Sequence, residues 1–213
     1  MNLAVIPARC GSKRVPNKNV KSFHGRPIIS YSIATARESG LFDEIVVSTD
    51  SQDYAAVAKQ YGAKVHMRPA KLADDITGTQ EVARSALMWW GECHPDRVPE
   101  YACCIYATAP LMTATDLRQG YAGLRSQETW SYVYSTGRDF VDAGQWYWGR
   151  ARAFLDGVPL AGNSILYQLP SERVCDINTE EDWISAELRY KEMQYRWTQK
   201  KSQPFVFESH QDG

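Results

Sequence analysis

The chain has 213 residues, of which 44% are hydrophobic, and this suits one sizeable domain with a well-covered core. Its formal net charge of −1 argues against nucleic acid or an anionic membrane as a partner. We find no signal peptide and no apolar run of membrane-spanning length, so we expect a cytoplasmic protein. The five cysteines include an adjacent pair, which suits a reducing compartment, and the scattered histidines argue against a zinc site.

Apolar runs of strand length alternate with segments of helical period, in the βαβα order of a mostly parallel sheet. Further along the chain, the pattern predicts two more strands and a final helix whose N-cap and acidic first turn are residues 179–182. The predicted strands lie near residues 3–6, 44–48, 64–66, 101–106, 131–135 and 142–149, and the helices near 28–38, 54–60, 81–90 and 116–124.

We therefore predict an α/β fold: a single Rossmann-like domain with a mostly parallel sheet flanked by helices, over residues 1–196. Residues 197–213 form a polar C-terminal tail that is expected to fray. In such a sheet the ligand site lies at the carboxyl ends of the strands. Asp50, at the end of the 45–50 run, is a carboxylate at such an end, with a structural or a functional role.

Fixed positive charge is concentrated directly after the first strand. Arg9, Lys13, Arg14 and Lys18 can neutralise a polyphosphate, while Gly11 and Ser12 let backbone amides approach it. The spacing matches neither the dinucleotide nor the P-loop signature. A basic surface loop without a ligand is the alternative, but four cations in a stiff loop repel one another unless an anion compensates them.

The order Ile-Pro-Ala-Arg-x-Gly-Ser-Lys-Arg-x-Pro-x-Lys-Asn over residues 6–19 resembles the signature loop of sugar nucleotidyltransferases that make CMP-activated acidic sugars. The fold implied is the nucleotide-diphospho-sugar transferase type. Cys10 stands where the relatives often have glycine; the nearby cations could lower its thiol pKa, but we interpret it as a tolerated replacement. The resemblance implies catalytic roles for Arg9 and Lys13 and nucleotide contacts for Ala8, Gly11, Ser12, Lys18 and Asn19.

Residues 66–79 match the arginine-proline-alanine loop that lies over the cytosine base in this family. The match implies base contacts from Arg68, Thr77 and Thr79. A pyrimidine edge needs fixed donors, and the start of the helix after this loop has free backbone N–H groups. Either threonine could instead, or in addition, be the N-cap of that helix.

Two segments resemble the pseudaminic acid branch of these cytidylyltransferases: Tyr-Ala-Thr-Ala-Pro over residues 106–110 and Asp-Ala-Gly-Gln-Trp-Tyr-Trp-Gly over 142–149. Sialic acid enzymes tend to carry Gln-Pro-Thr-Ser-Pro at the position of the first segment. The resemblance implies sugar contacts from Thr108, Gln145 and Tyr147. A plain strand-to-helix turn and an aromatic core strand are the alternatives, although alternating aromatic residues could offer one face as a stacking wall.

Residues 169–183 resemble the metal segment of the family, where Asp-Ile-Asp-Thr places two carboxylates on one face of a strand. Here the pair is Asp176 and Asn178, and Asp176 is also a catalytic candidate. An amide oxygen is a weaker, neutral ligand for Mg²⁺, the expected cofactor, and cannot act as a base. This departure puts metal affinity and turnover in question.

A second departure is the short connection between the strands near residues 131–135 and 142–149. The relatives carry some tens of additional residues there, which help to form a homodimer and supply basic residues to the partner's sugar site. This chain is therefore either a minimal form, natural or engineered, or a sequence from which a segment has been dropped. A homodimer is in question for the same reason.

The resemblance as a whole implies that CTP and a nine-carbon acidic (nonulosonic) sugar, pseudaminic acid, react to give the CMP-sugar and pyrophosphate. Synthesis of CMP-sialic or CMP-legionaminic acid is the alternative within the family. A catalytically weak CTP-binding homologue is the alternative outside it, motivated by Asn178 and the short connection.

Overall fold

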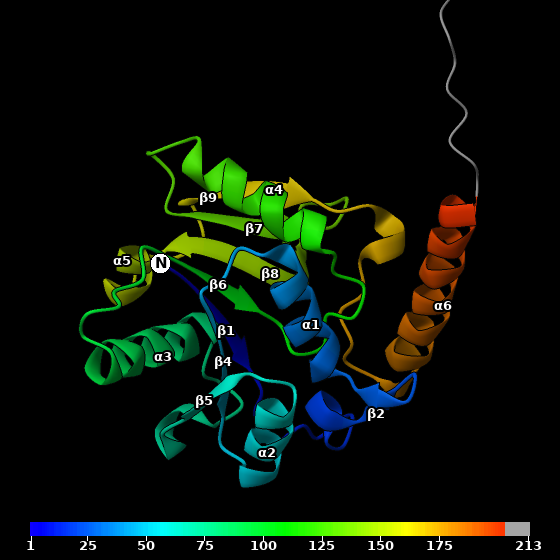
Figure 1. Cartoon of the computed structure of the whole chain (residues 1–213), viewed down its shortest axis with the longest axis horizontal. Helices are drawn as coiled ribbons and strands as arrows, with labels where there is room; N and C mark the ends of the chain where they lie inside the picture. The colour runs from blue at the N-terminus through cyan, green and yellow to red at the C-terminus, as the bar shows by residue number, and fades with distance from the viewer. Residues whose placement is uncertain (203–213) are drawn as a thin grey trace, which may run out of the picture.

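A seven-stranded sheet runs through the molecule in the order β5-β4-β1-β6-β8-β7-β9 (Figure 1). The computed structural model describes residues 1–202. The strands of this sheet are β1 (Asn2–Pro7), β4 (Glu44–Thr49), β5 (Lys64–Met67), β6 (Tyr101–Ile105), β7 (Tyr132–Thr136), β8 (Asp142–Arg150) and β9 (Ser164–Gln168). The helices are α1 (Ile29–Ser39), α2 (Gln52–Gln60), α3 (Thr79–Cys93), α4 (Ala114–Arg125), α5 (Ala151–Leu155) and α6 (Glu180–Ser202), and β2 (Ser22–Phe23) and β3 (Arg26–Pro27) form a separate hairpin.

Six of the seven strands run in one direction and β8 alone runs against them. This confirms the mostly parallel α/β sheet. The strand order turns back between β1 and β6, because β1 pairs with β4 on one side and with β6 on the other. Such a reversal leaves a crevice at the carboxyl ends of the two strands. Because β8 is antiparallel, its first residue, Asp142, lies at this same edge of the sheet.

The alternation of side chains along β1 divides the core into two layers. Leu3 and Val5 pack with α3 and α5 on one face, whereas Ala4 and Ile6 pack with α1, α2 and α4 on the other. All four side chains are fully buried, as expected for a strand covered on both faces. Burying a large apolar side chain such as Leu3 stabilises the fold by roughly 1.5–3 kcal/mol.

Local signals set the ends of several helices. α1 ends at Gly40, whose φ of 66° is the left-handed conformation that glycine adopts without strain. The hydroxyl of Ser51 accepts a hydrogen bond from the backbone N–H of Tyr54 at the start of α2. Thr113 and Asp116 form a capping box that begins α4. The helices in the first part of the chain start and end within a few residues of the predicted positions.

The last helix, α6, packs on the β2–β3 hairpin through a third apolar cluster that includes Phe23, Tyr31 and Trp183. Figure 1 shows it at the opposite end of the molecule from α3 and α5. Its predicted cap is confirmed, because Thr179 Oγ1 accepts a hydrogen bond from Asp182 N (3.2 Å), and Asp182 Oδ2 accepts one from Thr179 N (2.8 Å).

The tail expected to fray from residue 197 begins with helix instead, while the division into a domain and a tail stays a prediction. α6 continues to Ser202, so residues 197–202 are helical. Residues 197–202 contain neither glycine nor proline, so nothing in their sequence ends the helix. The rest of the predicted tail, 203–213, lies outside the described residues.

The short connection between β7 and β8 closes into a tight turn. The N–H of Gly137 donates to the carbonyl of Val141 at 2.8 Å, and Phe140 has a φ of 58°. The strands pair from Thr136 opposite Asp142 onwards. β7 and β8 therefore form a hairpin with this turn between them.

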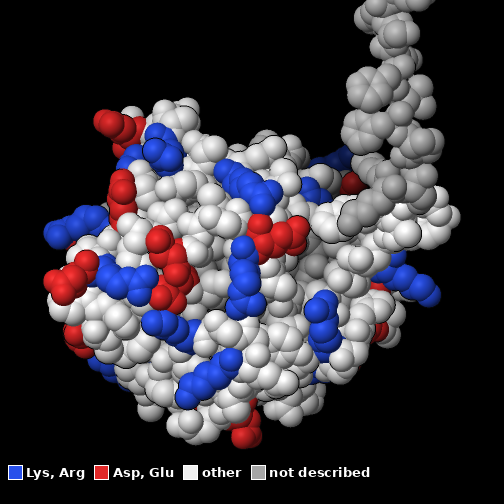
Figure 2. Space-filling model, in the orientation of Figure 1, with Lys and Arg blue, Asp and Glu red and all other residues white. Residues whose placement is uncertain are grey.

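In the part of the chain that the structure describes, no helix is long and apolar enough to cross a membrane. On the face shown in Figure 2, basic and acidic side chains are interspersed over the surface. This distribution agrees with the formal net charge of −1 and gives that face no extended field of one sign.

Two glycines of α4 test the packing between this helix and the sheet. A methyl group at Gly120 would overlap the indole ring of Trp146, whereas at Gly123 its nearest contact would be Val133 Cγ2 at 4.0 Å. We expect Gly120→Ala to lower the free energy of unfolding by about 1–3 kcal/mol through overpacking. Gly123→Ala should raise it by up to about 1 kcal/mol through helix propensity. Urea unfolding followed by circular dichroism measures both, and equal stability of the two variants would contradict this packing.

Candidate functional site

Hydrogen bonds to neutral and acidic groups hold the backbone of the loop after β1. The N–H of Ala8 donates to Ser48 O at 2.9 Å, and Asn19 Nδ2 donates to Arg9 O at 2.9 Å. The carboxylate of Asp50 accepts from the N–H of Cys10 at 2.9 Å. These contacts give Asp50 a structural role, and they tie the loop to the carboxyl end of β4.

The hypothesis of a lowered thiol pKa at Cys10 is wrong. Cys10 Sγ donates to Asp50 Oδ2 at 3.3 Å, and this hydrogen bond, with partial burial and the negative charge of Asp50, raises the pKa of the thiol. The sequence showed the cations beside Cys10 but not the carboxylate forty residues away. The interpretation of Cys10 as a non-nucleophilic replacement agrees with a protonated thiol.

A cavity of about 500 Å³ opens at the carboxyl ends of β1 and β6, where the strand order reverses. Five lysine and arginine side chains and one aspartate line it, so the charge of its lining suits an anion. The lining residues are Pro7, Arg9, Ser12, Lys13, Arg14, Lys18, Asn19, Arg68, Asp75, Thr77, Thr79, Val82, Tyr106, Ala107, Thr108 and Asn178.

Ten of the predicted site residues line this cavity: Arg9, Ser12, Lys13, Lys18, Asn19, Arg68, Thr77, Thr79, Thr108 and Asn178. Ala8, Gly11, Gln145, Tyr147 and Asp176 are not among the lining residues. Ala8 is fully buried, and the N–H of Ser12 donates to Cys10 O at 2.9 Å. The backbone N–H groups of Ala8 and Ser12 are therefore both used inside the protein. For Ser12 this differs from the expectation that its N–H faces a phosphate.

Arg9 and Lys13 both contact Asp75 across the cavity. Arg9 Nη1 lies 2.6 Å from Asp75 Oδ1, and Lys13 Nζ lies 2.7 Å from Asp75 Oδ2. The hydrogen bonds from these two cations lower the pKa of Asp75, so this carboxyl stays ionised. Sequence reasoning missed Asp75, because nothing in residues 74–75 shows which of the two carboxylates faces the loop after β1. We call this loop, residues 8–19, the phosphate loop because the sequence predicts that it binds phosphate groups.

Arg68 is buried and largely used by the protein itself. Its guanidinium donates to Ser48 O at 2.8 Å and to Leu72 O at 3.3 Å. His66 Nδ1 and Ser48 Oγ lie 3.0 Å apart, in a hydrogen bond under the same loop. Burial lowers the pKa of Arg68, and a nearby acid, Asp50, acts in the opposite direction. Arg68 therefore orders the 68–79 loop as well as lining the cavity.

The helix after this loop begins with Gly78 as its N-cap, so neither threonine is the cap. Asp74 Oδ1 accepts from the backbone N–H groups of Ile76 (3.0 Å) and Thr77 (2.7 Å) and fixes the turn. Thr79 Oγ1 accepts from the hydroxyl of Tyr147 at 3.0 Å. Thr77 and Thr79 line the cavity, and Asp74 fixes the backbone turn that precedes the helix.

The stacking wall expected on β8 is wrong, because the alternating side chains of this strand are buried in core layers on both faces of the sheet. Trp146 and Trp148 pack in one core layer and Tyr147 in the other. Gln145 is also buried; its Nε2 donates to Arg173 O, while its Oε1 has no hydrogen-bond partner among the described residues. Of the three predicted sugar contacts, only Thr108 lines the cavity.

The segment that contains Asp176 and Asn178 is tied to the phosphate loop. Lys18 Nζ donates to Ile177 O at 2.6 Å, and Arg14 Nη2 donates to Asn178 Oδ1 at 2.9 Å. Asn178 Nδ2 in turn donates to Asp176 Oδ2 at 2.5 Å. Burial lowers the pKa of Lys18, while the Asp176 carboxylate opposes this shift. Residues far apart in the chain thus form one polar cluster.

Asp142 is a second residue that the sequence reasoning assigned no role. Its Oδ2 accepts from the hydroxyl of Tyr106 at 3.2 Å, and its Oδ1 accepts from the N–H of Gly144 at 2.8 Å. Desolvation raises the pKa of the Asp142 carboxyl, and the charge of Asp176 adds to this. Within residues 1–202, no group of three or more His, Cys, Asp or Glu side chains could hold a metal.

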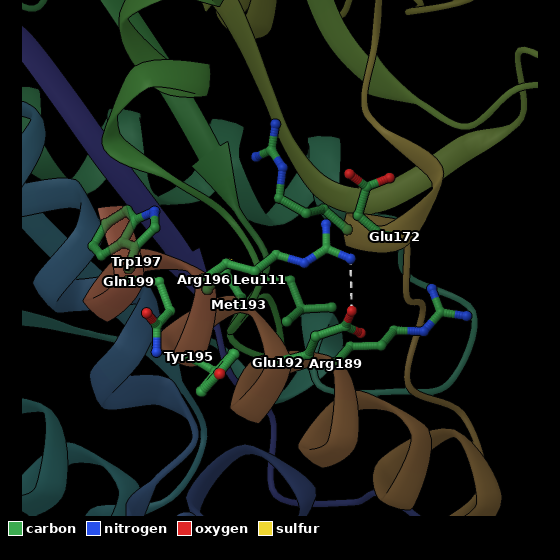
Figure 3. A pocket seen from close by; sticks show the side chains of 10 residues that line it. Leu111, Glu172, Arg189, Glu192, Met193, Tyr195, Arg196, Trp197 and Gln199 are labelled. Atoms are coloured by element: carbon green, nitrogen blue, oxygen red, sulfur yellow. Dashed lines mark hydrogen bonds and ion pairs between the residues drawn. The ribbon is translucent and has the colours of Figure 1, made fainter. Parts of the chain in front are cut away.

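A second cavity, of about 560 Å³, lies between α6 and the turn that precedes Asp176 (Figure 3). None of the predicted site residues lines it. Arg196 is paired with Glu192, as the dashed line in Figure 3 marks, and Arg189 donates to the carbonyl of Val174 at 2.7 Å.

A family model described as cytidylyltransferase matches residues 3–147, about two thirds of the chain. The pseudaminic acid cytidylyltransferase of Campylobacter jejuni is 34% identical over 225 residues, covering 89% of this chain and 96% of the relative. The chain therefore belongs to the cytidylyltransferase family, and the resemblance seen in the sequence is confirmed. The aligned stretch is longer than the whole chain, so this relative carries residues without a counterpart here.

Two further relatives match shorter stretches. A CMP-N,N'-diacetyllegionaminic acid synthase of Legionella pneumophila is 54% identical over 35% of this chain and 33% of its own length. An N-acylneuraminate cytidylyltransferase of Escherichia coli is 32% identical over 64% of this chain and 31% of its own length.

Solved structures confirm the fold. The CTP complex of a CMP:2-keto-3-deoxy-manno-octonic acid synthetase superposes with a TM-score of 0.66 at 14% identity, covering 91% of this chain and 99% of the other. Rv0371c of Mycobacterium tuberculosis in complex with manganese superposes with a TM-score of 0.58 at 15% identity, covering 86% and 95%.

His66 gives a testable pH dependence of stability. Burial lowers the pKa of this imidazole from 6.5 to about 4, with a smaller contribution from the positive charge of Arg68. Between these two values the unfolded state binds more protons than the folded state, so stability falls as the pH falls from about 6.5 towards 4. We expect urea unfolding at pH 7.5 and at pH 5 to differ less for His66→Gln than for the unchanged chain. An undiminished difference would contradict the buried neutral imidazole.

Proposed function

We propose that the chain is a CTP-dependent cytidylyltransferase that activates pseudaminic acid, a nine-carbon acidic sugar, to its CMP derivative with release of pyrophosphate. The observation that carries this proposal is the cavity lined by five cations at the strand-order reversal. The similarity to the Campylobacter jejuni enzyme over most of both chains supports the choice of sugar.

The nucleotide would bind with its triphosphate against the loop after β1. Arg9, Lys13 and Lys18 supply the charge that neutralises the phosphates. Asn19 holds the loop backbone through the carbonyl of Arg9. The cytosine base would lie towards Arg68, Thr77 and Thr79, on the same wall of the cavity as the 68–79 loop. Ala8, Gly11 and Ser12 serve the same site by shaping the loop.

The acidic sugar would enter beside the end of β6. Thr108 lines the cavity there and is the direct contact that we assign. Gln145 and Tyr147 are buried, so we assign them positioning roles: Gln145 holds the carbonyl of Arg173, and Tyr147 holds Thr79. The Tyr-Ala-Thr-Ala-Pro sequence at this strand end supports pseudaminic acid over sialic acid.

The donor set fits a hard divalent cation. Asp176 and Asp142 offer carboxylate oxygens within electrostatic reach of each other, and such oxygens suit Mg²⁺, which keeps several waters and binds phosphates as well. When bound, the ion would polarise the α-phosphate. Manganese in a structure of the same fold agrees with the use of a divalent metal. The amide oxygen of Asn178 is occupied by Arg14, which leaves Asp176 as the principal protein ligand.

The chemistry would be a single displacement. The anomeric hydroxyl of the sugar attacks the α-phosphorus of CTP, a new P–O bond forms, and the bond to the bridging oxygen of the β-phosphate breaks. Pyrophosphate leaves with the bond electrons, and Asp176 is the carboxylate that we assign to take the hydroxyl proton. Positioning and charge neutralisation by Arg9, Lys13 and Lys18 would lower the barrier, as in phosphoryl transfer generally.

Two alternatives have an observation in their favour. The legionaminic acid synthase and the N-acylneuraminate enzyme match this chain locally, which supports another nine-carbon sugar. Asn178, in place of a second carboxylate, supports a CTP-binding protein with little turnover.

The test is pyrophosphate release from CTP and Mg²⁺ with pseudaminic, legionaminic and sialic acid in turn, and we expect the fastest release with pseudaminic acid.

Lys13→Ala should lower kcat/KM by about 30- to 1000-fold, the loss typical of one transition-state charge contact. Lys59→Ala, an exposed lysine of α2, is the matched control and should keep full activity. A folded Lys13→Ala protein with undiminished turnover would refute the role of the loop, and no turnover with any sugar would favour the CTP-binding alternative.

Asn178→Asp restores the carboxylate pair of the family. The new carboxylate keeps a partner in Arg14 and adds a charged ligand beside Asp176, so we expect half-maximal activity at a several-fold lower Mg²⁺ concentration. A Mg²⁺ titration of pyrophosphate release measures this. If the Mg²⁺ requirement stayed the same, residue 178 would lie outside the metal site.

A further inference from the structure

The two cations at the mouth of the phosphate loop already have an anionic partner inside the protein. Asp75 places one carboxylate oxygen 2.6 Å from Arg9 Nη1 and the other 2.7 Å from Lys13 Nζ. Arg9 and Lys13 are the residues that the proposed function assigns to the triphosphate. A phosphate group that binds both of them in this geometry must first take the place of the carboxylate.

The exchange is energetically accessible because the pairs are exposed. The side chain of Lys13 is 82% exposed and that of Asp75 is 47% exposed. The side chain of Arg9 is 34% exposed. Ion pairs that water can reach are weak because the solvent screens them, so a ligand with several negative charges can displace one carboxylate. Arg9 keeps a second hydrogen bond, to Gly11 O at 3.2 Å, and would stay oriented during the exchange.

The loop can release Asp75 without losing its shape. The neighbouring Asp74 holds the turn through the N–H groups of Ile76 and Thr77, and Gly78 then begins α3. In the described part of the chain, the ion pairs of Asp75 reach only Arg9 and Lys13. Adjacent carboxylates therefore have separate tasks: one fixes the backbone, and the other is held only by the phosphate loop.

We propose that Asp75 is an internal competitor for the phosphate groups: it neutralises Arg9 and Lys13 in the empty site, gives way to the triphosphate, and returns to help release pyrophosphate. The proposal rests on the proposed function for the identity of the ligand. Because the Asp75 carboxylate competes for Arg9 and Lys13, it weakens the binding of CTP. For the same reason, it helps these two cations to release the pyrophosphate that the reaction forms. A residue that only oriented the two cations would have the opposite effect, because its removal would weaken anion binding.

The experiment compares Asp75→Asn with Asp74→Asn by isothermal titration calorimetry. Both substitutions remove one negative charge from the same loop, and asparagine at position 74 can still accept the two backbone hydrogen bonds. The probes are inorganic pyrophosphate, CTP and CMP, each with Mg²⁺. We expect Asp75→Asn to bind pyrophosphate and CTP about three- to tenfold more tightly, and CMP less than twofold more tightly. Asp74→Asn should change all three affinities less than twofold.

Enzyme kinetics give an independent measurement. In Asp75→Asn the KM for CTP and the inhibition constant for pyrophosphate should both fall by about three- to tenfold, because each reports the same competition. A merely structural residue would not lower the inhibition constant.

Unchanged or weaker pyrophosphate binding by Asp75→Asn would overturn the proposal, and so would an equal gain for Asp74→Asn. If the unchanged chain bound pyrophosphate but not CTP, the proposed function would fail while the competition could still be measured. If neither the unchanged chain nor Asp75→Asn bound pyrophosphate, the phosphate loop and the role of Asp75 would fail together.

Discussion

The repulsion among the positive charges at the end of β1 is the constraint on which the rest of the site depends. Five cations line one cavity, and each would move away from the others if nothing held it. Ser48, Asn19 and the carboxylate of Asp50 hold the loop backbone. Ile177 and Asn178 hold Lys18 and Arg14, and Asp75 compensates Arg9 and Lys13. Most of these partners are neutral hydrogen-bond acceptors and not buried anions. The cavity therefore keeps a net positive charge, which favours the binding of a polyphosphate.

The directions of the strands explain how this cluster is assembled. The parallel strands bring the ends of β1, β4, β5 and β6 to one edge, so the phosphate loop, Asp50, Arg68 and Thr108 meet there. β8 runs the other way and starts at that edge, which brings Asp142 beside Tyr106. The segment with Asp176 arrives from the far edge of the sheet and is fixed to the loop by Lys18 and Arg14.

Asn178 acquires a consistent role in this arrangement. Its amide is both a donor, to Asp176, and an acceptor, from Arg14, and it links the phosphate loop to the one carboxylate of the segment. A second aspartate could accept from Arg14 but could not donate to Asp176. In the proposed metal site, Asn178 would thus supply a hydrogen-bonded link in place of a second charge, and Asp142, whose pKa the charge of Asp176 helps to raise, is the further carboxylate that we assign there.

Sequence patterns alone were enough for the alternating elements, the mostly parallel sheet, the phosphate loop and most of the lining residues, because strand and helix periodicity and loop composition are local properties. They could not show the partners of Cys10, the contacts of Asp75 or the place of Asp142, since each depends on a residue distant in the chain. The aromatic run on β8 was misjudged for the same reason: the helices packed on the two sides of the sheet decide whether a strand has a free face, and they come from distant parts of the chain. Local chemistry thus determined which residues can bind an anion, and strand order and direction decided which of them meet.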